Sequence, residues 1–243
     1  MRLSTVDSIA LAVRAMEADV GRTFTNAQLA QIAMFSKFHF NRVFQEVTGI
    51  PPGRFLRALR LAEAKRLLLT SGLSVTDIGT LVGYSSSGTF STQFKHNVGM
   101  PPREFRANDG YRTLVLAPPP PSFGAAQDIT GQLECSVDLA GTVFVGAFPE
   151  PTPRSVPVAC TVLPGPGRFR IENVPAGRWH LFSLASARGG SPTHDRPVLG
   201  SGGQLEVTPG KSTPARHFRL RPPSPLDPPV LPAPFAVQVP HPA

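Results

Sequence analysis

Along residues 1–112 the apolar positions recur every three or four residues, which is the spacing of one face of an α-helix. Ser4 or Thr5, Thr25 or Asn26, and Thr76 are the expected N-cap residues. The longest helix is apolar over most of its surface, so we expect it to be buried at both ends or between two units. The predicted helices are 6–17, 27–35, 37–47, 53–70, 77–84 and 87–97.

Beyond residue 128 the period changes to two, and glycine and proline separate short apolar runs. In one run Phe169 and Ile171 alternate with Arg168, Arg170 and Glu172, which is typical of a half-buried strand. About seven such runs within 129–221 favour an antiparallel β-sandwich. The predicted strands are 131–137, 141–148, 156–163, 167–174, 177–187, 203–210 and 215–221.

Proline marks the boundary between these two regions. Only four of the 28 prolines precede residue 112, and Pro118–Pro121 favour a stiff polyproline II linker. We therefore predict a multidomain α and β chain, with an all-α double helix-turn-helix domain followed by an antiparallel β-sandwich of about seven strands. The predicted parts are a helical domain over 1–112, a linker over 113–128, the sandwich over 129–221 and a disordered tail over 222–243.

The helical region contains an internal repeat. When the chain is shifted by 50 residues, a regular set of positions coincides, and upstream of the turn the shift is 49. Such a pattern indicates a duplicated helix-turn-helix unit of about 50 residues. The matching pairs are Ser36 with Ser86, Phe40 with Phe90, Phe44 with Phe94, Gly49 with Gly99, Pro51-Pro52 with Pro101-Pro102, and Phe55 with Phe105.

In a helix-turn-helix unit the second helix enters the major groove of DNA. The first copy offers Lys37, Phe38, Asn41 and Arg42 there, and these side chains can read base edges. The second copy offers mostly short hydroxyls, which suit phosphates or water-mediated contacts. The alternative for Asn41 and Arg42 is a merely solvated surface. For Lys37, Arg54, Arg57 and Lys65 the choice lies between phosphate contacts and solubilising a helix.

Residues 6–108 resemble the AraC/XylS family of bacterial transcription regulators. The most specific part is Ile78…Val82-Gly83-Tyr84…Phe90…Phe94-Lys95…Gly99-Met100-Pro101-Pro102…Phe105-Arg106. The resemblance implies two helix-turn-helix subdomains joined by the long helix, with two recognition helices in successive major grooves. The chain departs from the family pattern at Ser87 and Gly88, where larger polar residues are common, and in carrying this domain first. The predicted DNA-binding residues are Ser36, Lys37, Phe38, Asn41, Arg42, Ser86, Ser87, Thr89, Ser91, Thr92 and Lys95.

The charge balance supports an anionic partner. The net charge is +8, and residues 1–112 hold 14 Lys/Arg against 8 Asp/Glu. We expect double-stranded DNA as the partner, with RNA polymerase and an unknown small-molecule effector as further candidates. The sequence predicts neither a transmembrane helix nor a signal peptide, so a cytoplasmic location without membrane contact is expected.

The β region is similar to carboxypeptidase-regulatory or transthyretin-like sandwich domains, through GRFRIENVPAGRWHLFSLAS and QLEVTPGKSTPARHFRLR.

From the helical region, the expected function is a sequence-specific DNA-binding transcription regulator. One alternative is a carbohydrate- or peptide-binding sandwich with a DNA-anchoring domain. A DNA-modifying enzyme is the other, but no nucleophile, cofactor or metal motif is recognised, so we predict no catalysis. The residues considered for catalysis are Cys135, Cys160, His180, His194, Asp195 and His217, and Trp179 is assigned to the core.

Overall fold

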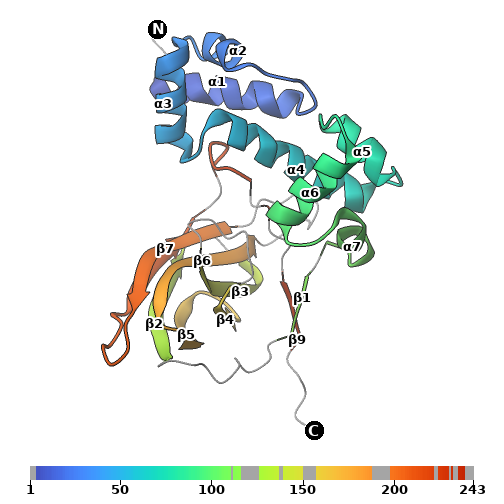
Figure 1. Ribbon diagram of the computed structural model, residues 1–243. Helices are drawn as coiled ribbons and strands as arrows, with labels where there is room; N and C mark the ends of the chain where they lie inside the picture. The colour runs from blue at the N-terminus through green and yellow to red at the C-terminus, as the bar shows by residue number, and fades with distance from the viewer. Residues whose placement is uncertain are drawn as a thin grey trace. The chain divides into compact units, whose positions relative to one another are not determined.

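The computed structural model describes residues 4–110, 112–115, 126–136, 139–149, 157–187, 198–221, 224–229, 231 and 235–238. The chain divides into two compact units (Figure 1). The helical unit comprises Met1–Gly110 together with Ser224–Ala233, and the β unit comprises Tyr111–Pro223 and Pro234–Ala243. A helical region followed by a β-rich region agrees with the fold class expected from the sequence.

Side-chain caps determine where several helices begin. The Ser4 hydroxyl accepts a hydrogen bond from the Asp7 amide at 3.1 Å, and Thr25 does the same for Gln28 at 3.2 Å. The Ser74 hydroxyl caps the fifth helix, so the prediction of Thr76 as its N-cap is wrong. The helix starts two residues earlier because Ser74 stands at capping distance from Asp77. The helices are α1 (Thr5–Ala18), α2 (Asn26–Ile32), α3 (Lys37–Thr48), α4 (Pro52–Thr70), α5 (Val75–Leu81), α6 (Ser87–Val98) and α7 (Pro102–Ala107).

The internal repeat is present in the packing of the core. Each helix-turn-helix subdomain is centred on three phenylalanines, and all six rings are at most 1% exposed. Centroid separations are 5.4 and 5.5 Å in the first triad and 5.7 and 5.5 Å in the second, with tilted or edge-on geometry. The two subdomains are therefore built on the same core. The triads are Phe40–Phe44–Phe55 and Phe90–Phe94–Phe105.

The long helix α4 belongs to both cores. Leu56 and Leu59 pack into the first cluster of buried side chains, whereas Leu61 and Leu68 pack into the second. This division explains why α4 is apolar around most of its circumference, as the sequence pattern predicts. One continuous helix thereby fixes the distance between the two subdomains.

Arg60 of α4 adds a polar connection between the subdomains. Its guanidinium donates to the carbonyl oxygens of Val20 at 2.8 Å and Arg22 at 3.0 Å, both in the loop between α1 and α2. A third hydrogen bond, of 3.1 Å, reaches the Gly83 carbonyl in the turn between α5 and α6. Burial lowers the pKa of the Arg60 guanidinium, but a guanidinium stays protonated in proteins, so Arg60 keeps its charge. Arg60 thus joins the loop of one subdomain to the turn of the other.

The turn inside each subdomain contains a residue with positive φ. In the second copy this residue is Gly83, at φ +86°, and in the first copy it is Met34, at φ +57°. A Cβ on Gly83 would lie 2.6 Å from the Gly21 carbonyl oxygen and 2.8 Å from the Arg60 guanidinium carbon. Glycine is required there both for its backbone conformation and for the close approach of Arg60. The Met34 side chain is 63% exposed, so the first copy has room for it.

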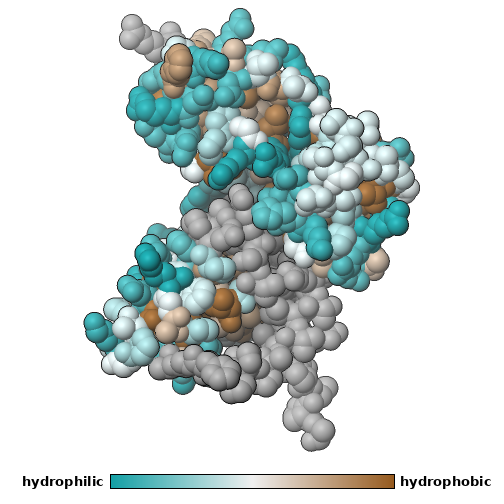
Figure 2. Space-filling model, viewed as in Figure 1, coloured by the Kyte–Doolittle hydropathy of each residue, from teal (hydrophilic) through white to brown (hydrophobic). Residues whose placement is uncertain are grey.

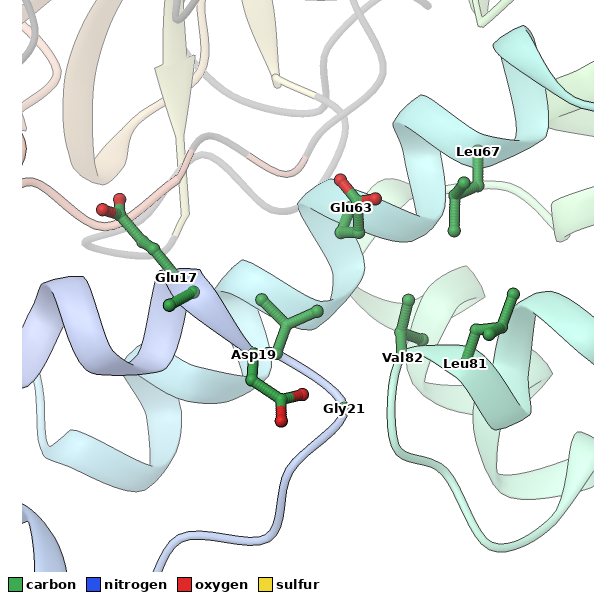
Figure 3. A pocket seen from close by; sticks show the side chains of 9 residues that line it. Glu17, Asp19, Gly21, Glu63, Leu67, Leu81 and Val82 are labelled. Carbon is green, nitrogen blue, oxygen red and sulfur yellow. The ribbon is translucent and has the colours of Figure 1, made fainter.

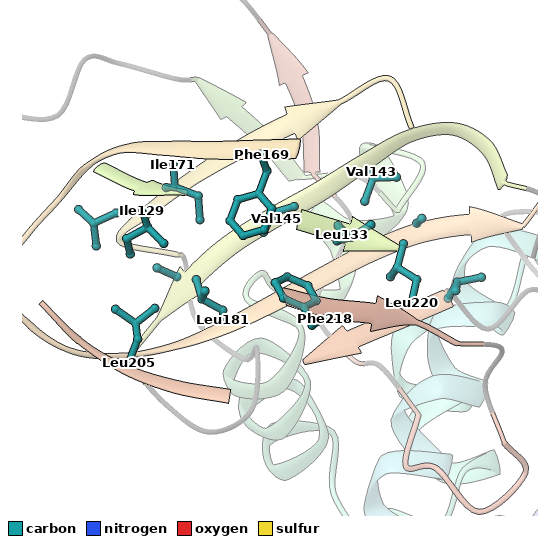
Figure 4. Close-up of a cluster of buried hydrophobic side chains, with 14 of the residues drawn as sticks. Ile129, Leu133, Val143, Val145, Phe169, Ile171, Leu181, Leu205, Phe218 and Leu220 are labelled. Carbon is teal, nitrogen blue, oxygen red and sulfur yellow. The ribbon is translucent and has the colours of Figure 1, made fainter. Parts of the chain in front are cut away.

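The β unit contains one three-stranded and one four-stranded sheet around a shared core (Figure 4). The strand orders are β5-β2-β8 and β4-β3-β6-β7, and β1 pairs with β9 in a separate ribbon. Figure 4 shows side chains from both sheets, among them Val145 and Phe218, meeting in the core. The strands are β1 (Arg112–Val115), β2 (Gln127–Cys135), β3 (Leu139–Phe148), β4 (Ala159–Leu163), β5 (Gly167–Val174), β6 (Gly177–Ala187), β7 (Val198–Val207), β8 (Arg216–Leu220) and β9 (Phe235–Gln238).

The prediction of an antiparallel sandwich is wrong for one pair of strands. β8 pairs with β2 in parallel, with Leu133 opposite Phe218. Outside the predicted sandwich, β1 and β9 also pair in parallel. The alternation in β8 predicts which side chains are buried, but it carries no information on the direction of the neighbouring strand.

The segments expected to be a linker and a tail contain ordered parts. β1 lies at the start of the expected linker over 113–128, whereas Pro118–Pro121 lie outside the described residues. Within the expected disordered tail over 222–243, Leu226 and Leu231 pack against the helical unit. These two leucines interrupt a proline-rich segment, and burying their apolar side chains in the helical core favours the packing.

We predict that Gly83→Ala destabilises the helical unit more than Gly49→Ala. Both glycines have positive φ, but a Cβ at Gly49 meets nothing within 4 Å. Gly49→Ala should reduce the free energy of unfolding by about 1 kcal/mol, and Gly83→Ala by about 2–4 kcal/mol. Urea denaturation of both variants measures the difference, and equal losses would contradict the proposed steric role of Gly83.

Removal of the Arg60 guanidinium should also destabilise the unit. Arg60→Met leaves three backbone carbonyls without this donor, and we expect a loss of about 2–3 kcal/mol in the free energy of unfolding. Arg57→Met removes an exposed charge from the same helix and should change stability by about 0.5 kcal/mol or less. Arg60→Lys should recover only part of the loss, because one ammonium cannot reach all three carbonyls. Urea denaturation gives all three values, and full recovery by lysine would argue against the bridging geometry.

Candidate nucleic-acid interface

The two helix-turn-helix turns have the same hydrogen bonding. The Phe35 amide donates to the Ala30 carbonyl at 2.9 Å, and the Tyr84 amide donates to the Gly79 carbonyl, also at 2.9 Å. These bonds orient α3 against α2 and α6 against α5. Each recognition helix therefore presents the face opposite its phenylalanine pair to solvent.

On α3 the exposed face carries most of the predicted residues. Lys37, Phe38 and Arg42 are exposed, whereas Phe40 and Phe44 are buried, as the sequence predicts. Phe38 is 87% exposed, which is unusual for a phenylalanine that serves only structure. Ser36 is the N-cap residue, but its side chain makes no cap hydrogen bond. The start of α3 thus combines an apolar ring, two cations and a hydroxyl that capping does not use.

Asn41 and Ser91, which the sequence places on the exposed faces of α3 and α6, lie at the margins of those faces. Both residues are only half-exposed, and the Asn41 Oδ1 atom is buried without a hydrogen-bond partner within the described structure. The helical repeat explains this placement, because each residue follows a buried phenylalanine and precedes another by three positions.

Arg42 is held in place by two neighbours on α3. Its Nη1 atom lies 2.8 Å from Oε1 of Glu46, and its Nη2 atom lies 3.3 Å from Nδ1 of His39. The His39 ring in turn packs edge-on against Phe35, with centroids 5.0 Å apart. The sequence prediction missed both partners of Arg42, although the spacings of three and four residues on a helix indicate such contacts.

The exposed surface of α6 differs from that of α3. The Ser86 hydroxyl accepts from the Thr89 amide at 3.2 Å and donates to the Thr89 hydroxyl at 2.9 Å. These two predicted contact residues are therefore engaged in the helix cap. Ser87, Thr92 and Lys95 are exposed. The available groups on α6 are small hydroxyls at its start and one cation near its end.

The four basic residues considered as phosphate contacts form two groups. Lys37, Arg54 and Arg57 are exposed, whereas Lys65 is partly buried and its ammonium donates to the Leu231 carbonyl at 3.1 Å. The prediction of Lys65 as a phosphate contact or a solubilising charge is therefore wrong. Figure 2 shows that the visible face of the helical unit is largely hydrophilic, with scattered apolar positions.

A cavity of about 420 Å³ lies between α1, α4 and α5 within the helical unit (Figure 3). Glu17, Asp19 and Glu63 line it together with Leu67 and Leu81. Glu63 is also bound by Arg66, at 2.6 Å. Because carboxylates line this cavity, it would repel a phosphate, and the surfaces of α3 and α6 are the better candidates for contact with nucleic acid.

The β unit offers weak support for catalysis. Burial raises the pKa of the Cys160 thiol to about 11, so this thiol stays protonated at neutral pH. Cys135 is half-buried, and His180 and His217 lie on different strands, while His194 and Asp195 fall outside the described residues. The Trp179 indole packs against the core and donates to the Pro175 carbonyl at 2.8 Å.

The described residues show neither a candidate metal site nor a candidate membrane span. Within that part of the chain, no group of three or more His, Cys, Asp or Glu side chains is placed to hold a metal ion. None of the described helices has the length and apolar character needed to cross a membrane.

Comparison with known proteins gives matches in the helical unit. A family of helix-turn-helix domains matches residues 29–108. The transcriptional activator AarP of Providencia stuartii is 36% identical over 92 residues, which are 37% of this chain and 68% of AarP. The probable transcription factor PqrA of Proteus vulgaris is 35% identical over 80 residues, covering 33% and 66% of the two chains. An uncharacterised helix-turn-helix regulator of Haemophilus influenzae is 42% identical over 79 residues, but the chain spans only 26% of its length.

A solved structure matches the same region. An AraC-type transcriptional regulator from Chromobacterium violaceum is 29% identical, with a TM-score of 0.41, over 42% of this chain and 92% of the other. The alignment with AarP covers more than two thirds of that activator, and the family match over residues 29–108 includes both recognition helices. The chain therefore belongs to the AraC/XylS family of DNA-binding transcription regulators.

Proposed function

We propose that this protein regulates transcription by inserting α3 and α6 into two successive major grooves of one DNA duplex. The observation that carries the proposal is the duplicated unit itself, in which α4 and Arg60 hold two equally built helix-turn-helix subdomains together. Because one chain contains both recognition helices, a single copy is sufficient for a site with two halves.

In this proposal α3 supplies most of the base recognition. Arg42 reaches a guanine, Phe38 contacts a thymine methyl group, and Asn41 at the margin of the face pairs with adenine. Ser36 and Lys37 bind phosphates beside the groove. The exposure of Phe38 and Arg42 supports these roles, because both side chains project from the start of the helix without burial.

Helix α6 mainly positions the protein on the DNA. Ser87 and Thr92 are short and exposed, which suits contacts to phosphates or to water-bridged bases. Lys95 adds a phosphate contact, and Ser91 lies at the margin of the same face. The hydroxyls of Ser86 and Thr89 hold the cap, so their contribution is the orientation of the helix start.

The β unit is our candidate for the effector or partner domain. The outward-facing positions of the β5-β2-β8 sheet carry cross-strand ion pairs, Arg170 with Asp128 and Arg219 with Glu134. A polar, charged sheet face of this kind suits a polar ligand or a protein surface. A small-molecule effector and RNA polymerase are accordingly the further partners we propose.

Selection of bound DNA from a random pool by the purified full chain tests this function. The expected product is a motif with two halves about one helical turn, or about 10 base pairs, apart. The half read by α3 should show stronger base preference than the half read by α6. Enrichment of a single half, or of no motif at fixed salt concentration, would overturn the proposal.

Replacement of Arg42 tests the assignment of base recognition to α3. Arg42→Ala should weaken binding to the selected site by about 1–3 kcal/mol and relax the preference at one base pair, because a bidentate contact to guanine is lost. Arg14→Ala removes an equal, exposed charge from α1 and should leave that preference intact. Binding is measured by titration on the selected site and on single-base variants. Equal loss on selected and random DNA would show Arg42 to be a phosphate contact.

A further inference from the structure

A segment that follows β8 packs on the helical unit rather than on the β unit. We call its described residues, 224–229 and 231, the C-terminal strap. Leu226 packs against the first helix-turn-helix core, and Leu231 is buried in the second, with 7% of its surface exposed. One short segment therefore contacts both halves of the duplicated domain.

The spacing of the two leucines fits this bridging position. Five residues of extended chain span at most about 17 Å. Along α4 the first core takes Phe55, Leu56 and Leu59, and the second takes Leu61, Ala64 and Leu68. The middles of these two groups are separated by about two turns of helix, or about 11 Å. The strap is long enough to reach both cores when it runs beside α4 (Figure 1).

Local bonds and proline shape the strap. The Ser224 amide donates to Oδ2 of Asp227 at 2.7 Å, and the Asp227 amide donates to the Ser224 carbonyl at 3.0 Å, which closes a turn. Pro225, Pro228 and Pro229 restrict the backbone before docking. A preformed turn and fixed φ angles reduce the entropy lost when the segment binds.

Lys65 makes a polar contact with the strap. Its ammonium donates to the Leu231 carbonyl at 3.1 Å and lies 5.8 Å from the centre of the Phe105 ring. An ammonium taken out of water is unfavourable unless it gains hydrogen bonds, so its position is tied to a docked carbonyl partner. Burial also lowers the pKa of Lys65 to about 8.

We propose that the face of α4 and α7 around Lys65 is a docking site for a proline-rich peptide, and that the strap, residues 224–229 and 231 of this chain, is its occupant. In this position the strap braces the two helix-turn-helix subdomains against each other. The strap lies between β8 and β9 in the chain, so a movement of either strand can displace it. The docking itself is independent of the proposed function, whereas its effect on DNA reading rests on that function.

Titration of the Lys65 side chain by NMR, in the full chain with isotope-labelled lysine, tests the docking. In the native chain the pKa of Lys65 should be near 8, and Leu231→Ser should raise it toward the ordinary value of about 10.4. Leu73→Ser, which changes an exposed leucine outside the strap, is the matched control and should leave the value unchanged. Lys37, Lys95 and Lys211 serve as internal references.

Two results would overturn the docking: an ordinary pKa for Lys65 in the native chain, or the same lowered pKa in native and Leu231→Ser proteins. Leu226→Ser changes a side chain that is only partly buried, and it replaces Leu231→Ser if that variant does not fold. Its expected effect is a smaller rise in the pKa of Lys65 and faster amide hydrogen exchange across 226–229. Unchanged exchange and pKa in a folded Leu226→Ser protein would equally contradict the strap.

The effect on DNA is measured with selected sites whose halves are moved apart by one base pair. The native chain should lose about tenfold in affinity, and Leu231→Ser should lose clearly less, because its subdomains are no longer braced. Failure of the native chain to bind any selected site would count against the proposed function alone. Equal spacing tolerance in the two proteins would count against bracing by the strap.

Discussion

The hydrogen bonds of Arg60 are the constraint on which the rest of the helical unit depends. Packing of apolar side chains along α4 fixes how far apart the two subdomains lie, but such contacts are not directional. Three hydrogen bonds from one planar guanidinium, to Val20, Arg22 and Gly83, fix the orientation of one subdomain relative to the other. Because Gly83 lies in the turn before α6, its position relative to the first subdomain also affects where the second recognition helix points.

In the duplicated unit the buried positions are alike in the two copies, whereas the exposed positions differ. The phenylalanine triads have nearly the same geometry in both copies, because each must orient a recognition helix against its partner. Positions on the exposed faces do not take part in this packing. There, Lys37 and Phe38 of the first copy correspond to Ser87 and Gly88 of the second. Even the turn differs, since Met34 adopts a positive φ that Gly83 adopts without strain. The same core can therefore support two helices with different exposed surfaces.

Local sequence patterns predicted those parts of the structure that depend on local interactions. The repeat, the buried phenylalanines and the caps at Ser4 and Thr25 follow from spacings of three to four or about 50 residues. The contact between Lys65 and Leu231 joins residues 166 positions apart, and no periodicity marks it. The parallel pairing of β2 with β8 also joins distant residues, 85 positions apart. The partners of Arg42 are a different case, because His39 and Glu46 stand at helical spacing and could have been identified.

The ion pair between Arg42 and Glu46 has a consequence for specificity under the proposed mode of binding. Both side chains are more than half exposed, at 63% and 57%, so the pair contributes little to folding and is inexpensive to break. A guanine that accepts two hydrogen bonds from Arg42 can offset that loss. A non-matching base would offer Arg42 no such pair of bonds, so the loss of the ion pair with Glu46 would not be offset. The same carboxylate that orients Arg42 in the free protein thus disfavours non-matching DNA, and it widens the difference in affinity on which recognition rests.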